Sequence, residues 1–214
     1  EHRADEVLPA ASTIKVAVMA AAFRKQEAAM LDFGQLVSVP KSWAAGGSGV
    51  VKELHDGVQL SVLDLMTLMI ILSDNTATNA MIDLVGFDGA TAAAQAMGAK
   101  STIIKRKLMG AAYYDRPDYS IAIDNTTSAS DMVAIMKSIY RGNAASADSC
   151  VRMIDILLRQ QVNDRLPLWM PPGTKVAHKT GEFQTTRHDA GIVYPANGKS
   201  PYAIALMSTG LTDA

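Results

Sequence analysis

The strongest constraint on this chain is an apolar stretch near its beginning that contains a single charge. From Thr13 to Phe23 only Lys15 is ionisable, and this pattern predicts a helix buried on all sides that continues to about Met30. A buried ammonium without a partner is costly, so this lysine must be paired, deprotonated or facing a cleft. Ser12 lies at the start of the helix, one turn before Lys15 and on the same face. The hydroxyl and the amine can therefore share a proton.

This Ser-x-x-Lys pattern has an ordinary explanation as well. About one such pattern is expected by chance in a chain of this composition, and Ser38-Val39-Pro40-Lys41 is a second copy. Pro40 makes that copy an extended loop or turn and not the start of a helix. Taken alone, Ser12 and Lys15 fit either a catalytic pair or a helix cap followed by a snorkelling lysine.

Composition limits the classes of protein to consider. The chain has 214 residues, of which 49% are hydrophobic, which suffices for one large or two small domains. Its net charge of −1 comes from mixed acidic and basic residues, so we expect no nucleic-acid partner and no membrane-surface helix. The longest apolar runs, Val16 to Phe23 and Leu65 to Leu72, are too short to span a bilayer. Cys150 is the only cysteine, so no internal disulfide is possible, and no spacing resembles a metal site; we expect no metal and no cofactor.

Helical patterns dominate the first three quarters of the chain. After the first helix, we predict a short extended piece at Leu36 to Val39 and helices at Ser61–Leu72, Thr76–Gly86, Asp88–Met97, Ser128–Gly142 and Ala147–Gln161. Ser61 and Asp64 have the spacing of a helix start with a carboxylate in its first turn. Residues 105–126 have weak periodicity, and a loop of this length inside a compact domain is usually functional.

Strand patterns follow the helices. Lys175 to Phe183, His188 to Tyr194 and Tyr202 to Ser208 have strand character, and Asn197-Gly198 suits the turn of a hairpin. A helical block followed by an antiparallel sheet predicts an α+β fold with a crevice between the two parts. We therefore expect a mainly helical domain at 12–165 and a sheet domain made of 1–11 with 166–214.

Three short motifs occur in order along the chain. They are Ser12-Thr13-Ile14-Lys15, Ser73-Asp74-Asn75 and Lys179-Thr180-Gly181. The chance of finding both later motifs at this composition is roughly one in several hundred. With this set the sequence resembles the superfamily of class A β-lactamases and penicillin-binding proteins, from Leu8 to about Thr209. The resemblance implies a β-lactamase/transpeptidase-like fold and a serine hydrolase.

The catalytic roles follow from this chemistry and this resemblance. A serine is a weak nucleophile and needs a base, which Lys15 can be for Ser12 only if its pKa is lowered. The resemblance implies that Lys179 folds back toward Lys15, where a like charge would favour the neutral amine. Ser73 could then pass a proton to the departing nitrogen.

The expected binding residues surround this group. Asn75 can donate and accept at once, so it suits both the catalytic lysine and a substrate amide. By analogy with the family, the backbone N–H groups of Ser12 and Glu182 would form the oxyanion hole. Thr180 would hydrogen-bond a substrate carboxylate. Gly181 would let a ligand backbone approach its strand closely.

The sequence departs from the class A pattern in the long loop. Where those enzymes carry a glutamate that activates water for deacylation, this chain has Leu108, which cannot act as a general base. Acylation should survive, whereas fast release of a penicilloyl adduct is not expected. The departure looks like members of the fold that act as D-alanyl-D-alanine peptidases. Asp115 or Asp118 could replace the glutamate, or both could be solvated loop residues.

The preferred prediction is an enzyme that forms an acyl-serine intermediate with β-lactams or cell-wall peptides and releases it slowly. The alternatives are a fully active β-lactamase and a β-lactam-binding sensor or scaffold without turnover. The resemblance implies a periplasmic or secreted location. It also implies strands and a helix before Ser12 and a helix after Thr209, so we expect the chain to be a fragment of a longer protein.

We consider five further side chains as functional residues. For the three histidines we expect a structural role, and for Arg187 and Trp43 two interpretations stay open. His178 should point away from its lysine neighbour and pack, whereas His55 and His188 are expected at the surface. Arg187 could bind a substrate carboxylate or be an exposed residue at a strand end. Trp43 could wall the cleft or cap the core.

Overall fold

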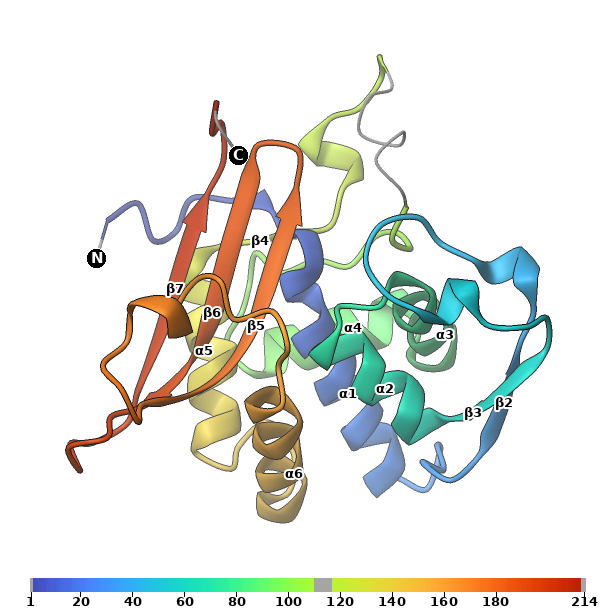
Figure 1. Ribbon diagram of the computed structural model, residues 1–214, viewed down its shortest axis with the longest axis horizontal. Helices are drawn as coiled ribbons and strands as arrows, with labels where there is room; N and C mark the ends of the chain where they lie inside the picture. Colours follow the sequence, from blue (N-terminus) through green and yellow to red (C-terminus); the bar gives the residue numbers. More distant parts are fainter. Residues whose placement is uncertain (1, 110–116, 213–214) are drawn as a thin grey trace.

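The computed structural model describes residues 2–109 and 117–212 and has the predicted α+β architecture. Figure 1 shows the sheet of strands β5, β6 and β7 on one side of the molecule, with helices α5 and α6 beside it and α1 among the remaining helices. No helix in the described ranges is both long enough and apolar enough to cross a membrane.

The helices agree closely with the predicted ranges. Their bounds are α1 Lys15–Glu27, α2 Val62–Ile71, α3 Asn75–Val85, α4 Phe87–Ala96, α5 Ala129–Tyr140 and α6 Ala147–Leu158. Short 3-10 turns lie at η1 Ala11–Ile14, η2 Lys41–Trp43, η3 Val51–Glu53, η5 Ile121–Ile123 and η6 Pro167–Trp169. The predicted start of α2 is confirmed, because the Ser61 hydroxyl accepts from the N–H of Asp64 and the Asp64 carboxylate accepts in return.

The first helix differs from its prediction at both ends. It starts with η1, so Ser12 lies in a tight 3-10 turn before α1 begins. It ends at Glu27, because Ala29 takes a left-handed conformation (φ 55°) and Met30 donates back to the carbonyl of Lys25. The usual signal for such an end is a glycine, and here an alanine fills that position, so the predicted helix was about three residues too long.

The main sheet has the order β5-β6-β7 and is antiparallel throughout. β5 Lys175–Phe183 and β7 Tyr202–Ser208 have the predicted bounds, and β6 Thr186–Tyr194 starts earlier than predicted. In this register Lys179 faces Ala190 and Gly181 faces His188 as Cα partners. Two small pairings complete the strands: β1 Leu8–Pro9 with β4 Thr126–Thr127, and β2 Leu36–Val39 with β3 Val58–Ser61.

One hydrophobic core joins the helices and the sheet. α1 is buried from Lys15 to Phe23, and it packs against α2, α3, α4 and α6. α5 packs against β6 and β7, α6 packs against β5, and Ala177, Ala190 and Ile192 of the sheet belong to the same cluster as the helices. The division into a domain at 12–165 and one at 1–11 with 166–214 stays a prediction.

Candidate active site

Lys15 lies at the centre of a polar cluster in an otherwise apolar interior. Its Nζ donates to the backbone oxygen of Ser73 (2.6 Å), to the Ser73 Oγ (3.0 Å) and to the Asn75 Oδ1 (2.9 Å). The side chain is fully buried. The first two of the three sequence motifs therefore meet here, although almost sixty positions separate them.

The turn between α2 and α3 presents Ser73 and Asn75 to this lysine. Ser73 is left-handed (φ 56°), which reverses the chain directly after α2. Asp74 then caps α3, since its Oδ1 accepts from the N–H of Ala77 at 2.9 Å. Its other oxygen accepts from the N–H groups of Val50 (2.6 Å) and Val51 (2.8 Å). Asp74 thus anchors the loop at Val50 and Val51, and its negative charge partly opposes the lowering of the Lys15 pKa.

Lys179 is the second buried lysine of the site. Its Nζ donates to the backbone oxygen of Thr180 at 2.8 Å and lies 3.5 Å from the Thr180 hydroxyl. Burial lowers its pKa to about 7, against an opposing effect of Asp189. Burial also lowers the pKa of Lys15 well below its usual range, and the positive charge of Lys179 lowers it further. The charge of Lys179 therefore favours the neutral amine of Lys15, as expected from the sequence.

Gly181 lies against the backbone of the serine segment. A side chain at this position would come within 3.2 Å of the backbone nitrogens of Ser12 and Thr13. The glycine therefore allows the protein's own backbone at η1 to approach β5 closely, and the approach of a ligand backbone stays a prediction. It brings the start of the serine segment against the strand that carries Lys179.

A cavity of about 230 Å³ opens over this group. Ser12, Asn75 and Glu182 line it, together with Leu108 and Arg187 among others. The remaining predicted residues do not line it, and all five are buried: Lys15, Ser73, Lys179, Thr180 and Gly181. Ser12 thus lies at the surface of the cavity while the two lysines lie within the protein. The described residues include no group of three or more His, Cys, Asp or Glu that could hold a metal ion.

Leu108 lies in the wall of this cavity, held by its backbone. Its N–H donates to the Asn79 Oδ1 (2.7 Å), and its carbonyl accepts from the Asn79 Nδ2 (2.9 Å). The side chain is only 6% exposed. Of the two aspartates considered as replacements for a glutamate, Asp118 is exposed and Asp115 lies outside the described residues.

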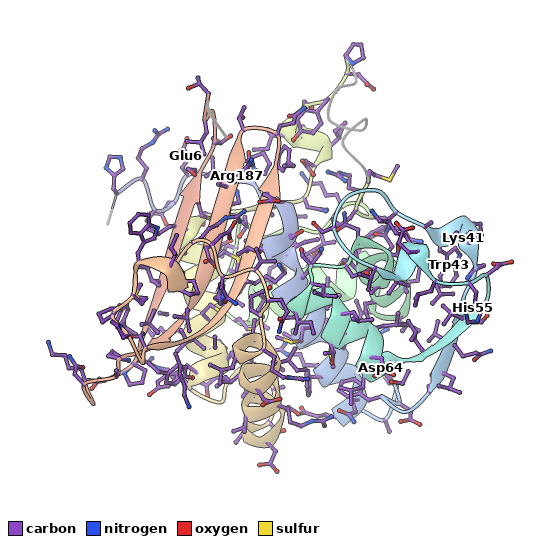
Figure 2. The ribbon with its side chains drawn as sticks, in the orientation of Figure 1. Glu6, Lys41, Trp43, His55, Asp64 and Arg187 are labelled. Atoms are coloured by element: carbon purple, nitrogen blue, oxygen red, sulfur yellow. The ribbon has the colours of Figure 1, made fainter. Side chains whose placement is uncertain are left out.

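Two arginines lie close to the Glu182 end of the cavity. Arg187 lines it and donates to the carbonyls of Gln184 and Thr186, both at 2.8 Å, and Figure 2 shows it at the end of the sheet. Arg165 pairs with the Glu182 carboxylate and donates to the carbonyls of Gly181 and His188. Sequence reasoning missed Arg165, because nothing in its surroundings along the chain points to β5.

The histidine predictions were partly wrong. His178 is buried and hydrogen-bonded to Asp189 (2.8 Å), as expected for a packing role, and His55 is exposed. His188, expected at the surface, is 1% exposed: its Nε2 lies 2.9 Å from the Pro9 carbonyl, and its Nδ1 accepts from the N–H of Ser208. No local pattern pointed to this burial, because both partners lie far away in the chain.

Comparisons with known proteins give one consistent result. The model of the Beta-lactamase enzyme family matches residues 1–214. Among curated proteins, the chain is 27% identical to Beta-lactamase BRO-1 of Moraxella catarrhalis over 97% of its own length, and 26% identical to Beta-lactamase AER-1 of Aeromonas hydrophila over 97%. It spans 66% and 68% of those two proteins.

Solved structures agree with the sequence matches. A β-lactamase from Sphaerobacter thermophilus is 32% identical with a TM-score of 0.91, covering 99% of this chain and 78% of that one. PBP-A is 32% identical with a TM-score of 0.86, covering 97% and 75%. A leucine-to-glutamate variant of PBP-A, solved as an acyl-enzyme complex with penicillin G, is 31% identical with a TM-score of 0.85, covering 99% and 76%.

Proposed function

We propose that this chain, which belongs to the Beta-lactamase enzyme family, is a penicillin-recognising serine hydrolase with Ser12 as its nucleophile. Its substrates are β-lactams or D-alanyl-D-alanine-type amides, and its intermediate is an ester on the Ser12 hydroxyl. It uses no metal and no cofactor in this scheme. The names of its relatives and the acyl-enzyme complex of PBP-A support this class of substrate.

One observation carries the proposal: Lys15 is buried, one turn from Ser12, among three oxygen atoms. The Ser73 carbonyl and the Asn75 Oδ1 can only accept, whereas the Ser73 hydroxyl can also donate. The Asn75 amide is oriented by its Nδ2, which donates to the Gly46 carbonyl at 2.7 Å. A neutral Lys15 can thus donate twice and accept once from Ser73. The cluster accommodates the amine in both protonation states.

The acylation step follows from these positions. The Ser12 Oγ attacks the carbonyl carbon of the substrate, and its proton passes to the neutral amine of Lys15. As the carbon–nitrogen bond breaks, Lys15 returns that proton through the Ser73 hydroxyl to the leaving nitrogen. The N–H groups of Ser12 and Glu182 hold the negative oxygen. Lys15 is not consumed, and Ser12 is left as an ester.

Substrate binding completes the scheme. The charge of Lys179 attracts the carboxylate of the substrate, and the Thr180 hydroxyl donates to it. Asn75 binds the substrate amide from the opposite wall. Gly181 keeps β5 close to the Ser12 backbone, so the two oxyanion donors stay near each other.

Deacylation is slow in this proposal. The hydrocarbon side chain of Leu108, in the cavity wall, cannot take a proton from water. A penicilloyl adduct therefore persists, while a peptide adduct is resolved without a carboxylate base. The relatives named β-lactamases favour the alternative of an enzyme with full turnover, which a different water activator would require.

The test follows the mass of the intact protein over time after mixing with penicillin G. We expect one lasting adduct on the wild type, none on Ser12→Ala, and a lifetime at least roughly tenfold shorter for Leu108→Glu, since a positioned base contributes about 10²–10⁴-fold. Leu108→Gln is the matched control, with similar shape but no base, and should keep the long lifetime.

The same experiment separates the alternatives. Many turnovers by the wild type would identify an active β-lactamase, and the absence of any adduct would reject acylation altogether. A lasting adduct leaves the peptidase and the non-turnover sensor, and release of D-alanine from a cell-wall peptide distinguishes them. The substrate class also implies a periplasmic or secreted location, which fractionation of expressing cells tests.

A further inference from the structure

A glycine-rich segment lies across the turn between α2 and α3. This segment, residues 45–51, is called the strap, and Figure 1 shows it in light blue in the connection between β2 and β3, near α3. The Asp74 carboxylate accepts from two backbone N–H groups at the end of the strap. The N–H of Asn75 donates to the Ser48 carbonyl at 3.0 Å. Two residues of the turn therefore bind the strap directly.

Hydrogen bonds, and not packing, hold the middle of the strap in place. Gly47 and Ser48 line the cavity that Ser12 also lines. Gly46 and Trp43 line a second cavity of about 320 Å³. The three strap residues in these two linings are exposed. An exposed segment with open space beside it keeps its position only as long as its hydrogen bonds persist.

Two glycines allow the strap to lie this close to the turn. Gly47 has a φ of 84°, and a Cβ atom at this position would come within 2.7 Å of the Asn75 Nδ2. Gly49 has a φ of 114°, and a Cβ atom there would overlap the carboxylate of Asp74. Both the backbone conformation and the close contact therefore require glycine. A larger residue at either position must push the strap and the turn apart.

The strap also determines which way the Asn75 amide points. The Gly46 carbonyl can only accept, so it binds the Asn75 Nδ2, at 2.7 Å. The Asn75 Oδ1 is thereby left to face the Nζ of Lys15, at 2.9 Å. The opposite orientation would put an NH₂ group against the Lys15 ammonium and two acceptors against each other at Gly46. The Gly47 carbonyl is held in turn by the Nζ of Lys52, at 2.6 Å.

We propose that the strap is a positioning element for acylation, in which Gly47 is the residue that keeps the Asn75 amide against Lys15. The inference rests on the proposed function, where Lys15 is the base for Ser12. Gly47 touches no reacting atom and acts through Asn75, so it is a positioning residue and not a catalytic one.

The test measures the second-order rate of Ser12 acylation by penicillin G as a function of pH. For Gly47→Ala we expect the maximal rate to fall roughly 10–100-fold, the size of effect that a displacement of about 1 Å has at a reacting group. The acid limb, where Lys15 takes up its proton, should move down by about 0.5–1 pH unit, because the charged amine loses an acceptor.

The other charges that act on Lys15 stay in place in this variant. They are those of Lys179 on β5 and Asp74 in the turn. The choice of Gly47 over Gly49 matters here, because a side chain at Gly49 would displace Asp74 itself. A shift of the acid limb in Gly47→Ala therefore reports the loss of the Asn75 acceptor.

Gly57→Ala is the matched control. Gly57 lies just before β3 with a φ of 70°, and a Cβ atom there would meet its nearest neighbour, the Ser38 Oγ, at 3.7 Å. This variant has the same kind of backbone strain without a collision. Its acylation rate and its pH profile should equal those of the wild type.

A second pair of variants loosens the strap without a collision. Lys52→Met removes the ammonium that holds the Gly47 carbonyl, and the rate should fall about two- to fivefold, as expected for one exposed charged contact. Lys52→Arg keeps a charged donor and should restore the rate. If Gly47→Ala does not fold, as judged by circular dichroism, this pair decides: equal rates in Lys52→Met and the wild type reject the proposal.

The outcomes separate the positioning role from the function. If penicillin G acylates the wild type and Gly47→Ala behaves like Gly57→Ala, the positioning role is rejected and the function stands. A lower rate in Gly47→Ala with an unmoved acid limb also rejects it, because a general structural defect would give that result. If the wild type forms no adduct at Ser12, the proposed function is rejected and the positioning role with it.

Discussion

Lys15 shows how burial changes the acid–base behaviour of an ordinary side chain. A lysine in water is protonated at pH 7, but the interior disfavours its charge and the nearby Lys179 adds repulsion. The three oxygen atoms around Nζ compensate by accepting hydrogen bonds. Burial and repulsion therefore lower the pKa of the amine, which lies one turn along the chain from Ser12.

Replacing Lys15 by methionine tests this role at the residue scale. We expect Lys15→Met to lower the rate of Ser12 acylation by roughly 10²–10⁴-fold, because the general base is lost. The side chain keeps a similar volume, so the fold should persist, which circular dichroism checks.

Lys25→Met is the matched control on the same helix. Lys25 donates to the Leu84 carbonyl at 2.8 Å and lines neither of the two cavities. Its loss should leave the acylation rate within about twofold. Near-normal acylation by Lys15→Met would mean that another group removes the proton of Ser12.

At the scale of elements, local patterns predicted the helices and the outer strands well, and errors occurred where a neighbour decided the outcome. The Ser61–Asp64 capping box lies within four residues, and it was found from sequence. His188 could not be placed in this way, because its partners are Pro9 of β1 and Ser208 of β7, far away in the chain. This one imidazole joins three strands.

The substitution His188→Phe tests how much these contacts of His188 contribute to stability. At pH 7.5 we expect the free energy of unfolding to fall by about 1–3 kcal/mol, because the Pro9 carbonyl and the Ser208 N–H lose their buried partner. Burial lowers the pKa of His188. The contribution of His188 to the free energy of unfolding is therefore complete above the pKa of about 6.5 that a histidine has in the unfolded chain. It is lost as the pH falls through the lower pKa of His188 in the folded protein.

The difference between wild type and His188→Phe should consequently narrow at pH 5, as measured by urea unfolding. His55→Phe serves as the control, because His55 is exposed and should change little at either pH. A difference that widens on acidification would contradict the neutral, buried imidazole.

At the scale of the whole molecule, the helices and the sheet enclose two lysines in a common interior. Lys15 enters from α1 and Lys179 from β5, and both are fully buried. Since each has a lowered pKa when folded, the unfolded chain binds more protons than the folded one above about pH 7. The free energy of unfolding should then rise with pH until the pH approaches about 10.4, the pKa of lysine in an unfolded chain.

This linkage predicts that the free energy of unfolding increases between pH 7 and pH 9. The slope is at most about 1.4 kcal/mol per pH unit for each lysine. In Lys179→Met the free energy of unfolding should increase less steeply with pH than in the wild type. In Lys25→Met the slope should equal that of the wild type. Chemical denaturation at pH 7, 8 and 9 measures these slopes. A flat or falling wild-type profile would show that the buried lysines stay charged.

Residue patterns alone predicted the α+β class, most element bounds and the three motifs, because helix periodicity, caps and strand alternation are set by neighbours within a few positions. Tertiary structure decided the rest. Packing alone brought Lys15 to Ser73 and Asn75, 58 and 60 positions away. It also put the backbone of η1 against Gly181, buried His188, and opened the cavity beside Trp43. Contacts between distant segments depend on how whole elements fill space, and no local pattern encodes that.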